Sequence, residues 1–153
     1  MIETLIYLAS LTSFVFDTKW CQDDTERLWH YTRIHTDDII HSDYIWLCIE
    51  NMKSMWLYNS NVLLYTIAHE LWHLYWHRFM TQEERAEWIE LSKQSSGNDF
   101  YRTWRNNSIY TEDFAEMFAS LYVPFYNDVL RIRTPLFREK QAFIKNWLKM
   151  RYF

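Results

Sequence analysis

Two histidines, with a glutamate beside the first, constrain this chain more than any other feature of its sequence. They lie in the string His69-Glu70-Leu71-Trp72-His73, four positions apart. On a helix this spacing places both imidazoles on one face, about one turn apart, where a single zinc ion can accept a nitrogen from each. The carboxylate of Glu70 can then act as a general base on a water molecule at the metal. The string therefore predicts a helix that carries a hydrolytic zinc site.

The residues on both sides of this string are compatible with a buried helix. Val62 to Ala68 and Leu74 to Trp76 are mostly apolar. Several residues in the first segment are β-branched or aromatic and would also suit a strand. The polar cluster Asn59-Ser60-Asn61 supplies good N-cap residues, so we expect the helix to begin near it.

The composition indicates a globular protein. Of the 153 residues, 49% are apolar and 20% are aromatic, which argues against a disordered chain and is enough for a core. We therefore predict one domain over residues 1–153. We expect it to be of the α+β class and mainly helical, with a small sheet packed on the active-site helix. The edge of such a sheet can receive an extended peptide.

Charge is divided unevenly along the chain. Residues 1–130 hold nine Lys/Arg and nineteen Asp/Glu, a balance of −10, whereas residues 131–153 hold seven and one, a balance of +6. We favour a basic C-terminal helix that docks by its aromatic face and keeps its charges in solvent or near the acidic body. The alternative is a contact patch for nucleic acid or a partner, formed by Arg131, Arg133, Arg138, Lys140, Lys145, Lys149 and Arg151.

The cysteines and the N-terminus bear on the compartment. Cys21 and Cys48 have no spacing typical of metal ligands, and we expect both to be reduced thiols. Residues 1–16 are apolar, but no Lys or Arg precedes Lys19 and no small-residue cleavage site follows, which argues against a signal peptide. No apolar run reaches the roughly 18 residues that a membrane span needs. We predict a cytoplasmic protein.

Local patterns predict the elements that precede the active-site helix. Residues 2–16 are expected to form a helix or a strand, and a short helix is expected around Thr25–Tyr31. The residues over Asp43–Ile49 are rich in β-branched and aromatic types and form the best candidate strand. A second strand is expected over Ser54–Tyr58.

Three more helices are expected after the active-site helix. The string Thr81-Gln82-Glu83-Glu84 has the form of a capping box and opens a helix to about Lys93, with Ala86, Trp88 and Ile89 in the core. Thr111 is the expected N-cap of a helix from Glu112 to about Tyr122, which Pro124 helps to stop. Thr134-Pro135 opens the last helix, whose apolar side holds Phe137, Phe143, Ile144, Trp147 and Leu148.

A catalytic zinc ion needs a third protein ligand from a second element that crosses the first. Glu112 and Glu116 lie one turn apart on one face of the helix expected from Glu112 to about Tyr122, with small Ala115 and Ala119 beside them. These small residues would let that helix approach the histidines closely. We predict that Glu112 ligates zinc and that Glu116 accepts a ring N–H from a ligand histidine, which fixes its tautomer.

Other residues remain open as third ligands. They are Asp113, Glu116 and the two histidines His77 and His41. His77 continues the face of His69 and His73, but a third ligand on one straight helix cannot close a tetrahedron around the metal. We expect His77 to be a core histidine or to support the ligands.

These residues together resemble the ImmA/IrrE-type peptidases, within the gluzincin branch of zinc metallopeptidases. That family reads approximately A-H-E-L-G-H-x-x-x-H and then E-x-x-A-N-x-F-A-x-x-L-L-x-P. This chain has Ala68 and the five-residue string followed by His77, and then Glu112, Ala115, Glu116, Phe118 and Ala119 in register, followed by Leu121 and Pro124. Trp72 replaces the glycine, Glu116 replaces the asparagine, and the gap from His73 to Glu112 is 39 residues long. More distantly, the chain also resembles the lethal-factor-type gluzincins.

The resemblance implies a zincin-like metallopeptidase that holds one Zn²⁺ through His69, His73 and Glu112. It also implies hydrolysis of a peptide bond in a protein substrate, such as a transcriptional regulator of a phage or mobile element. Such enzymes often add a tyrosine near the third ligand to hold the tetrahedral intermediate. Tyr110 and Tyr101 are the candidates for this role here, and either can instead be an aromatic core residue.

Two functions of other classes remain open. The first is a catalytically inactive zincin that acts as a protein-binding module, for example as an anti-repressor. An intact Glu70 argues against it, because a purely structural metal site needs no general base. The second is nucleic-acid binding through the basic C-terminal helix, which would show a steep salt dependence.

Overall fold

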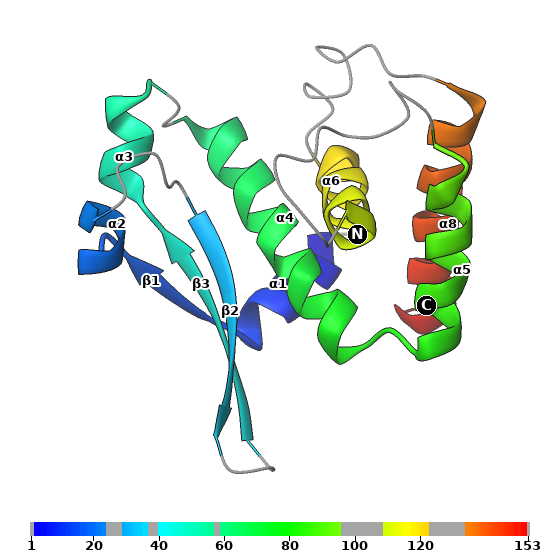
Figure 1. Cartoon of the computed structure of the whole chain (residues 1–153), viewed down its shortest axis with the longest axis horizontal. Coiled ribbons are helices and arrows are strands. Elements are labelled where there is room, and N and C mark those ends of the chain that lie inside the picture. Colours follow the sequence, from blue (N-terminus) through cyan, green and yellow to red (C-terminus); the bar gives the residue numbers. More distant parts are fainter. Residues whose placement is uncertain are drawn as a thin grey trace.

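The computed structural model describes residues 2–23, 29–36, 40–56, 59–95, 109–122 and 134–152. Over these residues the chain is of the α+β class and mainly helical, as predicted (Figure 1). In chain order the elements are α1 Ile2–Ser10, β1 Ser13–Phe16, α2 Lys19–Asp23, β2 Trp29–Thr36, β3 Ile40–Leu47, α3 Ile49–Ser54, α4 Ser60–Arg78, α5 Gln82–Lys93, α6 Ile109–Tyr122 and α8 Pro135–Tyr152. None of the helices in these ranges is long and apolar enough to cross a membrane.

The sheet has three strands in the order β1-β3-β2. β1 runs parallel to β3, and β2 runs antiparallel to it, with Trp29 opposite Leu47 and Tyr31 opposite Ile45. β2 is an edge strand and contacts α4, as does β3 (Figure 1). One face of the sheet therefore packs on α4, which leaves the side chains of Trp29 and Tyr31 partly buried against the core.

Helix α4 lies between the sheet and α6 (Figure 1). Its Trp72 is fully buried, and the indole ring stacks on Phe118 of α6 with the ring centroids 3.6 Å apart. Ala115 and Ala119 of α6 are also fully buried. Small side chains let two helices approach closely, and a stacked tryptophan fills the space beside them. The position where the resembled family has glycine thus holds a tryptophan that is buried at the α4–α6 contact.

Three of the helix starts predicted from local capping are confirmed. The Asn59 side chain accepts hydrogen bonds from the backbone N–H groups of Asn61 and Val62, which fixes the start of α4. Thr81 and Glu84 form the predicted capping box of α5. The Thr134 hydroxyl oxygen accepts a hydrogen bond from Phe137 N at the start of α8.

Four local predictions are wrong. Trp29 and Tyr31 belong to a strand instead of a short helix, because they pair with β3; residues 24–28 lie outside the described ranges. The strand expected over Ser54–Tyr58 does not begin at Ser54, because Ser54 is the last residue of helix α3. Helix α6 begins at Ile109, so Thr111 lies inside it and is not its N-cap. Ala86 is exposed instead of buried. The predicted stop at Pro124 lies outside the described residues.

The two cysteines form a disulfide, so the prediction of reduced thiols is wrong. Cys21 of α2 and Cys48, just before α3, are 27 residues apart in sequence, with their Cα atoms 5.4 Å apart. Because β1 and β3 are neighbouring and parallel, the segments that follow them leave the sheet at the same end. Nothing in the spacing of the cysteines reveals that topology.

The C-terminal helix docks by its apolar face, as we favoured. Phe137, Ile144 and Leu148 are buried. Lys140 is also fully buried, and its ammonium group lies 2.7 Å from Oδ2 of Asp113 on α6. Lys140 therefore cannot belong to a nucleic-acid surface. The side chains of Arg138 and Lys145 are exposed, and those of Arg131, Arg133, Lys149 and Arg151 lie outside the described part of the chain.

Candidate metal centre

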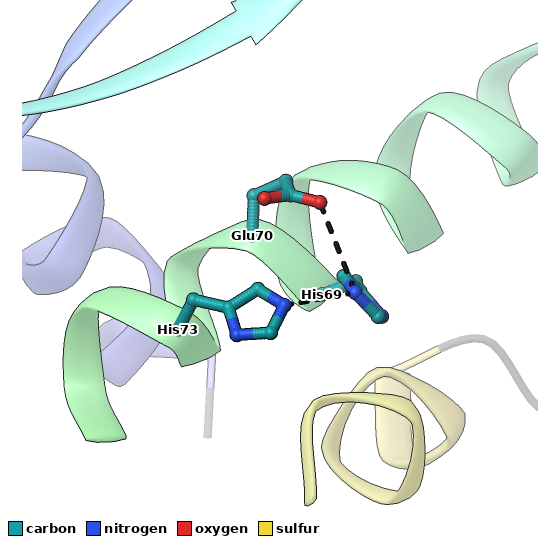
Figure 2. A group of neighbouring side chains, drawn as sticks. All are labelled: His69, Glu70 and His73. Atoms are coloured by element: carbon teal, nitrogen blue, oxygen red, sulfur yellow. Dashed lines mark hydrogen bonds and ion pairs between the residues drawn. The ribbon is translucent and has the colours of Figure 1, made fainter. Parts of the chain in front are cut away.

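The two histidines of the string meet on one face of α4, as their spacing predicts. The Nε2 atoms of His69 and His73 lie 3.1 Å apart. Figure 2 shows both rings and the carboxylate of Glu70 leaving the same helix, with α6 on the far side of His69. His69 is almost fully buried, and the side chain of His73 is 12% exposed. The pair is therefore held in place but remains open on one side.

Glu112 brings a carboxylate to both imidazoles from the neighbouring helix α6. Its Oε2 lies 3.3 Å from Nε2 of His69, and its Oε1 lies 3.4 Å from Nε2 of His73. Tetrahedral zinc with bonds of about 2.0–2.1 Å keeps neighbouring ligand atoms about 3.3–3.4 Å apart. Each imidazole Nε2 is thus close to this spacing from the other Nε2 and from one oxygen of Glu112, a different oxygen for each histidine.

Glu70 lies beside this trio and is buried. Its Oε1 is 3.8 Å from Nε2 of His69 (Figure 2). One potential ligand atom from each of His69, Glu70 and His73 lies within 4.8 Å of the other two. Burial raises the pKa of Glu70, although the charges of His69 and His73 oppose the rise. A carboxylate with a raised pKa is a stronger proton acceptor, which is the property that a general base requires.

Glu116 lies on the other side of His69. Its Oε1 is 3.2 Å from Nδ1 of that ring, a buried nitrogen for which the described residues supply no hydrogen bond. Burial raises the pKa of Glu116 to about 8. An N–H on Nδ1 would leave the Nε2 lone pair of His69 directed toward Glu112 and His73. This placement agrees with the predicted tautomer-fixing role of Glu116, which itself stays a prediction.

The remaining electrostatics favour an ionised Glu112. Burial alone would raise its pKa, but its hydrogen bonds to His69 and His73 and their charges outweigh burial and lower the pKa. For His73, burial alone would lower the pKa, yet the hydrogen bond that its ring donates to Glu112 and the charges of Glu70 and Glu112 raise it. In the metal-free chain these acids therefore favour a positive charge on His73, next to the place where a cation would bind.

A cavity of about 390 Å³ opens at the trio. Its lining comes from three elements. β2 supplies Trp29 and Tyr31, α4 supplies His69, Glu70, His73 and His77, and α6 supplies Thr111 and Glu112. A substrate segment that enters this cavity would meet both the candidate ligands and the edge strand of the sheet.

Several predicted site residues lie elsewhere. Tyr110 does not line the cavity, and its backbone oxygen accepts a hydrogen bond from Nε1 of Trp88. Asp113 faces Lys140 and cannot be the third ligand. His77 lines the cavity and is exposed, so it is not a core histidine, and the other expected role, support of the ligands, stays a prediction. Tyr101 and the side chain of His41 lie outside the described part of the chain.

Three residues at or behind the site had been missed in the sequence: Trp29, Tyr31 and Asp43. The first two line the cavity from β2, and the third is a buried carboxylate behind them. The alternation of Trp29 and Tyr31 is a strand pattern that places both on one face. It could have revealed the first two residues, had the segment not been assigned to a helix.

Neither protein-family models nor curated proteins nor solved structures match this chain. The resemblance to the gluzincins thus stays a prediction made from motifs. A function can be inferred from the geometry of the residues around His69, His73 and Glu112.

Proposed function

We propose that this chain is a zinc-dependent endopeptidase with a zincin-like metallopeptidase fold. The observation that carries the proposal is the meeting of His69, His73 and Glu112 from two helices, with 3.1–3.4 Å between the atoms that would bind the metal. Two imidazoles and one carboxylate form a donor set that zinc uses in catalytic sites, with one position left for water.

The ligand set fits zinc better than it fits Ca²⁺ or Mg²⁺. Those cations take oxygen ligands, and Mg²⁺ prefers six of them in an octahedron, whereas two of the three donors here are nitrogens. When bound, zinc would lower the pKa of a water ligand toward 7 and polarise the scissile carbonyl group. The roles described next belong to the residues of the chain.

Glu70 is the proposed general base and acid. Its carboxylate takes a proton from the attacking water as the water oxygen bonds to the carbonyl carbon of the substrate. It then gives this proton to the amide nitrogen as the carbon–nitrogen bond breaks. Burial has raised its pKa, which suits both steps. Because Tyr110 does not line the cavity, the proposal gives it no role; His77 and Thr111 are cavity-lining donors outside the ligand set.

We infer a protein or peptide substrate that binds in an extended form. The support is the position of edge strand β2, whose Trp29 and Tyr31 line the same cavity as the proposed ligands. An exposed strand edge offers backbone hydrogen bonds to an added strand. A transcriptional regulator is the substrate that the motif resemblance suggests. The single domain and the cytoplasmic location stay predictions, and the disulfide is a bond more common in oxidising compartments.

The alternative is an inactive zincin that binds a protein partner without cutting it. Zinc binding and Glu70 distinguish the two functions. A chain that binds zinc but hydrolyses no peptide under any condition would favour the binding module. The burial of Glu70 next to both histidines favours the enzyme.

The test uses the zinc-loaded protein and a mixture of denatured proteins and peptides. We expect cleavage by the wild type, and a loss of about 10²–10⁴-fold in Glu70→Gln with zinc retained, because only the base is removed. The matched control is Glu83→Gln, which changes an exposed glutamate of α5. Equal activity in Glu70→Gln would contradict the mechanism, and zinc binding without cleavage in the wild type would support the alternative.

A further inference from the structure

The ring of Tyr31, in edge strand β2, lies nearly parallel to the rings of two histidines of α4. The ring is stacked on that of His77 with an interplanar angle of 5° and a centroid distance of 6.1 Å. It is also stacked on the ring of His73, at 22° and 6.2 Å. His73 is a proposed zinc ligand, so the phenol ring of Tyr31 faces one side of a ligand ring.

The hydroxyl group of Tyr31 is held by a buried carboxylate of β3. It donates a 2.6 Å hydrogen bond to Oδ1 of Asp43, whose side chain is fully buried. The other oxygen of this carboxylate accepts a hydrogen bond from Arg78, 3.2 Å away. A buried carboxylate that accepts hydrogen bonds from a phenol and a guanidinium holds both in fixed directions.

These contacts close a loop through the fold. Arg78 belongs to the C-terminal end of α4, Asp43 to β3 and Tyr31 to β2, and the ring of Tyr31 returns to His73 on α4. The loop joins the sheet to the helix on the side of the site opposite α6. A shift of β2 relative to α4 would therefore change the support of the His73 ring.

The two proposed ligand histidines are supported differently. His69 has the Glu116 carboxylate 3.2 Å from its Nδ1. Within the described residues, His73 has no such carboxylate at Nδ1, and its contacts are made through Nε2 and the stack on Tyr31. An imidazole without a partner at its second nitrogen can rotate unless packing limits the rotation.

We propose that Tyr31, anchored by Asp43, is a positioning residue of the metal centre. It sets the ring plane of His73, so that Nε2 stays directed toward His69 and Glu112. This inference rests on the proposed function, because it concerns the same metal site. Tyr31 does not supply the oxyanion donor, since its hydroxyl is engaged with Asp43.

The test compares metal binding in three variants. Tyr31→Leu removes the ring, Tyr31→Phe keeps the ring and removes the anchor, and Tyr44→Leu is the control. Tyr44 is a partly buried tyrosine of β3 on the opposite face of the sheet, beside Trp46. Zinc affinity is measured by competition with a chelating dye, and ligand geometry by the visible absorption of the Co²⁺-loaded protein.

We expect Tyr31→Leu to lose about 10–100-fold in zinc affinity and to change the Co²⁺ spectrum, as removal of other supporting residues of metal ligands does. Tyr31→Phe should show a smaller loss, of several-fold, and Tyr44→Leu should match the wild type in both measurements. A purely structural role of Tyr31 would lower the melting temperature without changing the Co²⁺ spectrum.

Three outcomes decide the matter. Wild-type affinity and an unchanged spectrum in a folded Tyr31→Leu would overturn the positioning role and leave the proposed function standing. Absence of zinc binding in the wild type would overturn the proposed function itself. If Tyr31→Leu does not fold, Tyr31→Phe decides: wild-type affinity and spectrum overturn the anchor, and a several-fold loss supports it.

Discussion

Two neighbouring carboxylates on different faces of α6 differ in their partners and in their exposure to solvent. Glu112 and Asp113 are adjacent in sequence and carry the same charge. Glu112 points to the histidines of α4, and its side chain is 32% exposed. Asp113 points to α8 and is fully buried. One face of the helix is thus open at an acidic site, and the other is closed over an ion pair.

The closed face supplies its own cation. Oδ2 of Asp113 accepts hydrogen bonds from the ammonium group of Lys140 and from the Ser92 hydroxyl. Lys140 also donates a 2.5 Å hydrogen bond to the Ser95 hydroxyl oxygen. A buried charge is tolerated when it is paired and hydrogen-bonded, and on this face the pairing cation comes from the chain itself.

The open face has no such cation. Within the described residues, the acids near His69 and His73 are Glu70, Glu112 and Glu116, and none of the three forms an ion pair with Lys or Arg. Carboxylates gathered around imidazoles without a basic side chain attract an external cation. The acid on the closed face therefore has a structural role, whereas the acids on the open face are the ones that we propose to serve a bound cation.

The largest expected effect on stability lies on the closed face. Asp113→Ala should destabilise the chain by about 3–5 kcal/mol, because it leaves the ammonium group of Lys140 buried without its partner. Urea unfolding measures this effect, and Glu112→Ala, on the open face, is the comparison. A similar loss in both variants of the metal-free chain would break the distinction between the faces.

A smaller effect is expected from Glu116 on the open face. Glu116→Ala should weaken zinc binding by about 10–100-fold, because the carboxylate next to Nδ1 of His69 no longer orients that ring. Competition with a chelating dye measures the affinity. Glu87→Ala, an exposed acid of α5, should leave it unchanged. Unchanged affinity in Glu116→Ala would show that the contact to His69 is incidental.

A further effect is expected in the pH dependence of the open face. Burial raises the pKa of Glu116 from 4.5 to about 8 in the metal-free chain. A group whose pKa is higher in the folded chain stabilises it fully below the unfolded value, and this stability is lost as the pH rises through the folded value. The metal-free chain should therefore lose stability from about pH 4.5 to about pH 8.

The raised pKa of His73 acts in the same direction above its ordinary value of 6.5. Zinc should reverse the trend, because it requires neutral imidazoles and binds more tightly as protons leave them. Thermal unfolding at pH 5 and pH 8, with and without zinc, measures both slopes. Glu116→Gln, which removes one raised pKa, should flatten the metal-free slope, and a slope that does not change contradicts the assignment.

The sequence predicts the parts of the site that depend on local spacing. The four-residue interval places His69 and His73 on one face of any helix, and the cap at Asn59 fixes where that helix begins. Glu112 follows from the need for a third ligand on a second helix with small neighbours. Such features can be read directly because they depend on the periodicity of a helix.

The sequence does not predict the parts that depend on pairing between distant segments. The alternation of Trp29 and Tyr31 indicates a strand, but the pairing of that strand with β3, which brings Tyr31 to the site, cannot be read from the local pattern. The disulfide of Cys21 and Cys48 depends on the parallel order of β1 and β3. Lys140 looked like a surface charge, since nothing near it in sequence shows that Asp113 lies opposite.

Zinc content tests the central claim most directly. Elemental analysis of the purified protein should find about one zinc per chain in the wild type and in the control Glu87→Ala. Zinc should be lost in His73→Ala and in Glu112→Ala, which each remove one of the three proposed ligands. A wild type without zinc, or a Glu112→Ala variant that keeps it, would contradict the account of the open face of α6.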